Sequence, residues 1–275
     1  MRHHLTGLAL CGACGFNSHQ VTGDTAATDA PALDAPTEII ADAAVDTAVD
    51  GGPDAGPDAA PDGGGPSTPF PLCNPTDPHL VACYSLDGDV RDGSAHHLDA
   101  SLVEVLYAAG KVGQALRLGP LSSVQVPDSP FLDVASVTVE AWINPLQLPE
   151  GNDRAFLVNA SDQYGIFLAA QGQVGCSFIT AQTVTAIGRI AAEEWHHVAC
   201  TFDRSSAALY VDGALIDNAR PKGMLSTKGS AGVSIGGEKP GAPSRYIGLI
   251  DEIRVLDVAR TAAEICVDAG LSTCP

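Results

Sequence analysis

The chain has 275 residues and a formal net charge of −19, with 33 acidic and only 14 basic residues. Phosphate binding depends on clustered Lys and Arg, so this balance, without an obvious basic stripe, excludes nucleic acid as an expected partner. No stretch of about 20 apolar residues follows the N-terminal region, so no membrane-spanning helix is expected.

The N-terminal 13 residues have the order of a secretory signal peptide. A basic start at Arg2 is followed by an apolar patch at 5–10 and by two small residues directly before Cys14. This order resembles a bacterial lipoprotein signal, in which the cysteine after the cleavage site takes up diacylglycerol. Cys14 is therefore the predicted lipidation site, with Cys11 as the alternative acceptor. The resemblance implies export and lipid anchoring at the outer membrane or cell surface, the anchor being the only expected contact with a membrane.

Residues 14–77 are predicted to form the anchor cysteine and a disordered tether. From 21 to 71 the chain is almost entirely Ala, Asp, Gly, Pro, Ser and Thr, has no Lys or Arg, and includes the run GPDAGPDAAPDGGGP. Such a segment buries too little apolar surface to offset the entropy of ordering it. Much of the negative charge therefore belongs to a spacer; the alternative is an acidic partner-binding tail.

Residues 78–275 are predicted to form one all-β domain, an antiparallel two-sheet sandwich. Short apolar runs alternate with Gly, Pro, Asn and Asp, and helical periodicity is almost absent. The predicted strands are 80–86, 115–118, 124–126, 137–143, 155–158, 164–169, 174–179, 184–187, 196–202, 207–211, 233–235 and 250–255. One helix is expected after 261, where Thr261 and Glu264 have the spacing of a capping box.

Six cysteines of the domain are disulfide candidates, because an exported chain reaches an oxidising compartment. They are Cys73, Cys83, Cys176, Cys200, Cys266 and Cys274. Cys176 and Cys200 lie inside strand patterns and are the first expected pair. The other four, near the two ends of the domain, either pair end to end or pair locally. Zinc is not favoured, because the domain contains no C-x-x-C pair.

Six motifs of this region resemble those of the laminin-G-like, concanavalin A-like jelly-roll domains, in the same order. They are CYSLDGDVRDGSAHHLDA (83–100), GKVGQALRL (110–118), VQVPDSPFLD (124–133), SVTVEAWINP (136–145), EWHHVACTFDRSSAALYVDG (194–213) and YIGLIDEIRV (246–255). The fifth also reads as an antiparallel hairpin with a polar turn. The resemblance implies a jelly roll and a domain that binds rather than catalyses.

The expected function is therefore recognition of a glycan or of another surface or matrix protein. One alternative is a structural envelope component without glycan affinity, and a less favoured one is a carbohydrate-active enzyme. Glycanases of this architecture place two or three carboxylates at alternating positions of one strand. Here Glu140 stands alone and Asp251 and Glu252 are adjacent, so no catalytic residue is predicted.

Two aspartates are candidate calcium ligands. The resemblance places Asp87, in the first turn, beside Asp251, in the last strand, and calcium prefers carboxylate and carbonyl oxygens. The alternative is that Asp87 only stabilises its Asp-Gly turn and that Asp251 bonds neighbouring backbone amides.

Four further residues are candidate ligand contacts because they lie near predicted loops and strand ends, where a jelly roll presents its ligands. They are Arg154, Tyr164, Arg245 and Tyr246.

Overall fold

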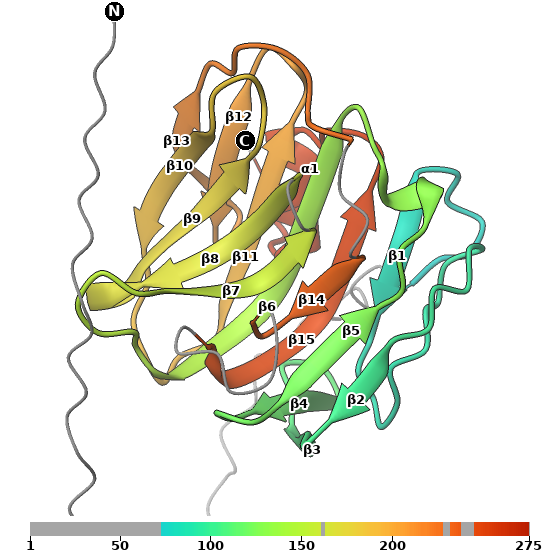
Figure 1. Ribbon diagram of the computed structural model, residues 1–275, viewed down its shortest axis with the longest axis vertical. Coiled ribbons are helices and arrows are strands. Elements are labelled where there is room, and N and C mark those ends of the chain that lie inside the picture. Colours follow the sequence, from blue (N-terminus) through green and yellow to red (C-terminus); the bar gives the residue numbers. More distant parts are fainter. Residues whose placement is uncertain (1–72, 161–162, 228–231, 238–244, 275) are drawn as a thin grey trace, which may run out of the picture. The chain divides into compact units, whose positions relative to one another are not determined.

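The computed structural model describes residues 73–160, 163–227, 232–237 and 245–274 (Figure 1). The predicted signal peptide, the lipidation site Cys14 and the tether up to residue 72 lie outside the described residues.

Two antiparallel sheets pack face to face, which confirms the predicted jelly-roll sandwich (Figure 1). Within the described residues, one sheet contains β13 (Ala214–Ala219), β12 (Ala207–Val211), β11 (His196–Phe202), β6 (Val137–Gln147), β15 (Ile247–Leu256), β4 (Gln114–Leu118) and β3 (Leu106–Ala109) in that order, with β1 (Leu80–Tyr84) also paired to β15. The other contains β10 (Val184–Arg189), β9 (Gln173–Phe178), β8 (Tyr164–Ala169), β7 (Arg154–Ala160), β14 (Val233–Ile235), β5 (Ser123–Val126) and β2 (Ser101–Val103). Two 3₁₀ turns, η1 (Pro130–Leu132) and η2 (Ala170–Gly172), and the helix α1 (Ala262–Asp268) complete the described elements.

Strands β2, β3 and β13 were not predicted from the sequence. Each lies at an end of its sheet, and their side chains are mostly exposed. An edge strand has one hydrogen-bonded neighbour and little buried surface, so its residues need not alternate between apolar and polar.

Strands β11 and β12 form the predicted hairpin. The side chains of β11 alternate between the core and the outer face of the sheet, where α1 packs. Val198, Cys200 and Phe202 lie in the core between the sheets. Ala199 points to the opposite face, where it packs with Ile265 of α1. Helix α1 therefore covers the outer face of the larger sheet, and its capping box is present as predicted.

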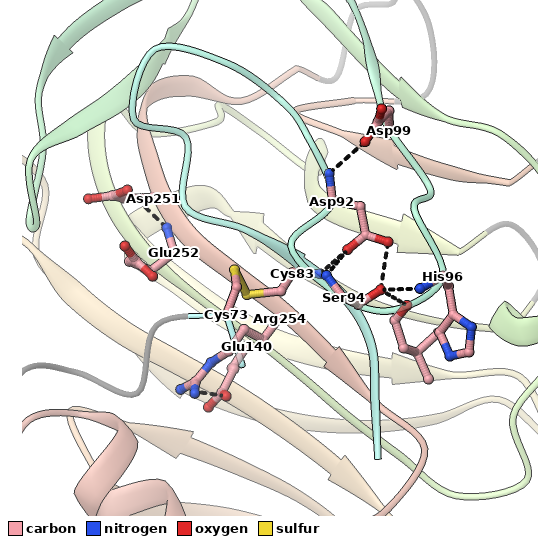
Figure 2. Close-up of a disulfide and its surroundings, with 11 residues drawn as sticks. Cys73, Cys83, Asp92, Ser94, His96, Asp99, Glu140, Asp251, Glu252 and Arg254 are labelled. Atoms are coloured by element: carbon pink, nitrogen blue, oxygen red, sulfur yellow. Dashed lines mark hydrogen bonds and ion pairs between the residues drawn. A yellow bond between two sulfur atoms is a disulfide. The ribbon is translucent and has the colours of Figure 1, made fainter. Parts of the chain in front are cut away.

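Three disulfides connect the six candidate cysteines. Cys176 bonds Cys200, as expected, but the bridge joins β9 to β11 and so links the two sheets across the core. The remaining four pair locally, Cys73 with Cys83 (Figure 2) and Cys266 with Cys274, which settles the alternatives left open.

A buried ion-pair network lies between the larger sheet and α1. Arg254 Nη2 is 2.8 Å from Glu140 Oε1 (Figure 2). It is also 3.3 Å from Asp268 Oδ1, and His197 Nε2 is 3.3 Å from Glu140 Oε2. Burial opposes ionisation of Glu140, but Arg254 and His197 outweigh it and hold the pKa of this carboxyl below its usual range. The network therefore ties the helix to the sheet through charge.

Candidate functional site

One end of the smaller sheet carries a polar hollow of about 230 Å³. Arg154 begins β7 and Arg189 ends β10, and antiparallel pairing brings both to the same end of the sheet: Arg154 lies opposite Ala169, and Arg189 opposite Gln173. Between them, the turn η2 adds Gln171 to the lining. This hollow, here called the rim hollow, is also lined by Gly151, Asn152, Asp153, Ala169, Ala170 and Gln173.

The two arginines of the rim hollow are fixed by neutral groups. The Arg154 guanidinium carbon lies 4.6 Å above the ring of Phe167, and Arg189 Nη1 donates to the Gln171 carbonyl at 3.0 Å. Within the described part of the chain, neither forms an ion pair with a carboxylate, in contrast to the buried Arg254. Asp153 also lines the hollow, but the described residues include no ion pair of either arginine, and two oriented guanidinium groups favour a ligand with negative or hydroxyl oxygens.

The conformation of Gln171 supports a functional role for the turn. Its φ of 58° lies in the left-handed region, which costs a residue with a Cβ on the order of 1 kcal/mol. This backbone gives the Gln171 carbonyl to Arg189 while the residue lines the hollow.

A second hollow, of about 170 Å³, adjoins the first and shares Asp153 with it. It is lined by residues 147–150 after β6 and by Arg245 and Ile247 before and within β15. Burial lowers the pKa of the Arg245 guanidinium. The structure thus places two of the four candidate ligand residues, Arg154 and Arg245, beside neighbouring hollows.

Tyr164 and Tyr246, the other two candidates, lie in the core and are 2% and 1% exposed. Their hydroxyl groups donate to backbone carbonyls, that of Tyr164 to Leu132 at 3.3 Å and that of Tyr246 to Leu249 at 2.8 Å. In this structure they line neither hollow, so the candidate site is built without them.

Arg189 and Gln171 were not predicted as ligand-binding residues from the sequence. Their positions at a strand end and in a short turn were the available signal, but that signal is shared by many polar residues of a jelly roll.

The two candidate calcium ligands meet at the loop between β3 and β4. Asp251 Oδ2 accepts hydrogen bonds from the backbone N–H groups of Lys111 and Val112, at 2.8 and 3.0 Å, and Asp87 Oδ1 accepts one from Gln114 at 2.6 Å. Asp251 therefore makes the backbone contacts that the alternative interpretation expects, whereas Asp87 bonds the backbone of β4 rather than its own Asp-Gly turn.

A third carboxylate adds to this cluster. A bulge in β15 gives Glu252 a φ of 48°, and Figure 2 shows its carboxyl group on the same side of the strand as that of Asp251. Burial raises the pKa of Asp251 to about 6, and burial with the charges of Asp251 and Asp87 raises the pKa of Glu252 to about 8. Glu252 Oε1 is buried and has no hydrogen-bond partner among the described residues.

The fit of this cluster to calcium is partial. It offers hard oxygen donors crowded together, and one of them is unsatisfied. However, no three His, Cys, Asp or Glu side chains of the described chain are arranged to hold one ion. Calcium takes six to eight oxygens, so backbone carbonyls or water would have to supply most of them.

The two antiparallel sheets form a jelly-roll sandwich with polar hollows at its strand ends. The chain belongs to the concanavalin A-like lectin/glucanase superfamily, since the sequence profile of that family matches residues 119–266. No curated protein matches the chain.

Solved structures with a similar fold include three described complexes. Domain 4 of AbnA, a GH43 extracellular arabinanase from Geobacillus stearothermophilus in complex with arabinotriose, has a TM-score of 0.58 and 23% identity, covering 70% of this chain and 98% of that domain. The binding domain of botulinum neurotoxin DC matches at 11% identity in complexes with SialylT and with rat synaptotagmin II, with TM-scores of 0.58 and 0.60. These two matches cover 70% and 71% of this chain and 51% and 52% of the toxin domain, so the chain spans about half of its length.

Proposed function

We propose that the domain is a noncatalytic glycan-binding module and that the rim hollow is its site. The observation that carries this proposal is the pair Arg154 and Arg189, which flank a hollow lined by amide side chains and have no carboxylate partner among the described residues. Guanidinium groups bind carboxylates through paired hydrogen bonds, while amides exchange hydrogen bonds with hydroxyl groups. The ligand class is therefore a glycan that carries carboxylate groups.

The shared fold supports this proposal in general terms, since similar domains have been solved with arabinotriose and with SialylT. The positions of the carboxyl groups Asp251 and Glu252, whose pKa values are raised, do not favour a catalytic role. Asp251 and Glu252, which have the raised pKa that a general acid needs, are buried and line neither the rim hollow nor its neighbour.

The test is a glycan array probed with the full chain. We expect binding to one or more carboxylated glycans, and Arg154→Ala with Arg189→Ala should weaken it at least tenfold, or about 1.4 kcal/mol. Arg204→Ala, an exposed arginine in the turn between β11 and β12, is the control. A blank array, or binding that the double variant leaves unchanged, contradicts the proposal. Co-purification of one stoichiometric partner with a blank array would instead favour a structural envelope component.

We further propose that the domain is displayed on the cell surface by a lipid on Cys14 and by a tether that ends before Cys73, which is bonded to the domain. The support is the order of the N-terminal sequence and the composition of the tether. In the described part of the chain, no helix is long and apolar enough to cross a membrane. Cys14→Ser should move the protein from the membrane fraction to the soluble fraction; retention in the membrane fraction would contradict lipid anchoring.

We also propose that calcium stabilises the cluster of Asp87 and Asp251. The support is the crowding of three carboxyl groups and the unsatisfied Glu252 Oε1.

A further inference from the structure

A third hollow, of about 400 Å³, lies at the other end of the sandwich from the rim hollow and its neighbour. It is lined mainly by Pro78, His96, Pro130, Phe131, Asp133 and Asp257. Asp133 lies in the segment that leads into β6 and Asp257 directly follows β15, whereas the hollow beside the rim adjoins the opposite ends of the same two strands. At ~3.3 Å per residue, the length of β6 separates these ends by on the order of 30 Å.

The third hollow contains a fixed aromatic surface. Phe131 is 54% exposed although it follows a buried core strand, because η1 turns Leu132 into the core and Phe131 outward. Its ring stacks on His96, with centroids 3.9 Å apart and planes 26° apart. A ring that is held on one face and still exposed offers a preorganised apolar contact.

A buried carboxylate holds the loop that presents His96. Asp92, which is 5% exposed, accepts hydrogen bonds from the backbone N–H groups of Cys83, Ser94 and Leu98, and the Ser94 hydroxyl also donates to it. Ser94 Oγ in turn accepts from the His96 N–H at 3.1 Å (Figure 2). The aromatic pair therefore rests on a loop whose conformation is set from the interior.

Two carboxylates face this hollow, and each is oriented through one oxygen. His79 Nδ1 lies 2.8 Å from Asp257 Oδ1, and Gln163 Nε2 donates to Asp133 Oδ1. No hydrogen bond or ion pair from a described residue reaches Oδ2 of either aspartate. Each Oδ2 is thus an acceptor placed beside an apolar surface.

We propose that the third hollow binds an uncharged sugar residue, so that the domain has a second glycan site at the end opposite the rim hollow. The apolar face of a pyranose or furanose ring matches the single exposed plane of Phe131, and its hydroxyl groups donate to Asp133 and Asp257. The two carboxylates repel an acidic sugar. A quaternary or alkyl ammonium is disfavoured because one stacked ring does not surround a cation.

Two sites at opposite ends make the domain bivalent. A polysaccharide strand that carries both acidic and neutral residues, or two strands of a network, can then be held at once, which raises the overall affinity without any new contact. The second site does not depend on the rim hollow, because the two share no residue.

The test is calorimetric titration of the full chain with hexasaccharides of arabinan, xylan, β-1,4-glucan, mannan and N-acetylchitin. We expect one of these neutral probes to bind and both Phe131→Ala and Asp257→Asn to weaken it about tenfold, or ~1.4 kcal/mol. Leu121→Ala, an exposed apolar residue outside the hollow, and Asp89→Asn are the matched controls. Because Phe131 is exposed, its variant should keep the melting midpoint of the wild type.

The rim variant Arg154→Ala with Arg189→Ala should retain this neutral-sugar binding, which separates failure of the second site from failure of the proposed function. Absence of binding to all five probes at millimolar concentration overturns the second site, as does binding that Phe131→Ala leaves unchanged. Choline and L-arginine form a second arm. Binding of either, lost in Phe131→Ala and without any sugar binding, would assign the hollow to a cation and overturn the proposal.

Discussion

Cys176 of β9 and Cys200 of β11 form a disulfide that joins the two sheets through the core, with Cα atoms 5.6 Å apart. Both residues are fully buried, and each belongs to a different sheet. The bridge therefore fixes the separation of the two sheets where β9 of one sheet faces β11 of the other.

Replacing both cysteines by alanine should lower the free energy of unfolding by about 3 kcal/mol, because the bridge closes a long loop in the unfolded chain. Urea unfolding monitored by circular dichroism gives the value. Cys266→Ala with Cys274→Ala opens a shorter loop and should cost less. Equal stability of the Cys176–Cys200 variant and the wild type would show that packing alone holds the sheets together.

Glu140→Gln should destabilise the protein by about 3 kcal/mol at pH 7, since it leaves Arg254 and His197 without their shared buried partner. The folded-state pKa of Glu140 lies below its ordinary value of 4.5, so its contribution is present above that pH and is lost as the pH falls through the folded-state value. The difference between variant and wild type should therefore shrink below about pH 4.

Urea unfolding at several pH values between neutral and acidic measures this difference. Glu104→Gln, an exposed carboxyl away from the network, should change little at any pH. A constant difference across the series would mean that shape, rather than charge, accounts for the loss.

Calcium at millimolar concentration should raise the melting midpoint above its value in EGTA, because a ligand that binds only the native state stabilises that state. At a hundredfold excess over Kd the gain in the free energy of unfolding is about 2.7 kcal/mol. Asp87→Asn should remove the shift while keeping an acceptor for the Gln114 N–H. Asp89→Asn, an exposed neighbour paired with Arg91, should keep it. An unchanged midpoint in the wild type would leave the carboxylates with their backbone contacts alone.

Gln171→Gly should keep the stability within about 1 kcal/mol of the wild type, because glycine relieves the left-handed backbone while it loosens the unfolded chain. It should nonetheless weaken glycan binding, since the side-chain amide leaves the rim hollow. Gln171→Asn, which tolerates the same backbone, shortens the amide and should weaken binding as well. Thermal melts and the array measure the two effects separately, and full binding by both variants would remove Gln171 from the site.

Much of the fold could be predicted because its signals are local. Alternation marks the central strands, as at Val198, Cys200 and Phe202, and Thr261 with Glu264 marks the start of the helix. The edge strands β2, β3 and β13 lacked this signal, since one side of each has no neighbouring strand and most of their side chains are exposed.

The candidate site was predicted less well. Arg154 and Arg245 lie beside hollows, whereas Tyr164 and Tyr246 entered the core with their hydroxyl groups bonded to carbonyls. An aromatic residue at a strand end has the same sequence signature in either position, because burial depends on which element packs above it.

By itself, the sequence determined the all-β class, the central hairpin and the capped helix, since each follows from side-chain periodicity or residue type within a short segment. Only the tertiary structure decided that Cys176 pairs with Cys200 across the two sheets, that Arg154 and Arg189 line one hollow, and that Asp133 and Asp257 share a hollow with Phe131. These residues are distant in sequence, and strand pairing in an antiparallel sandwich brings them together through contacts that leave no local pattern.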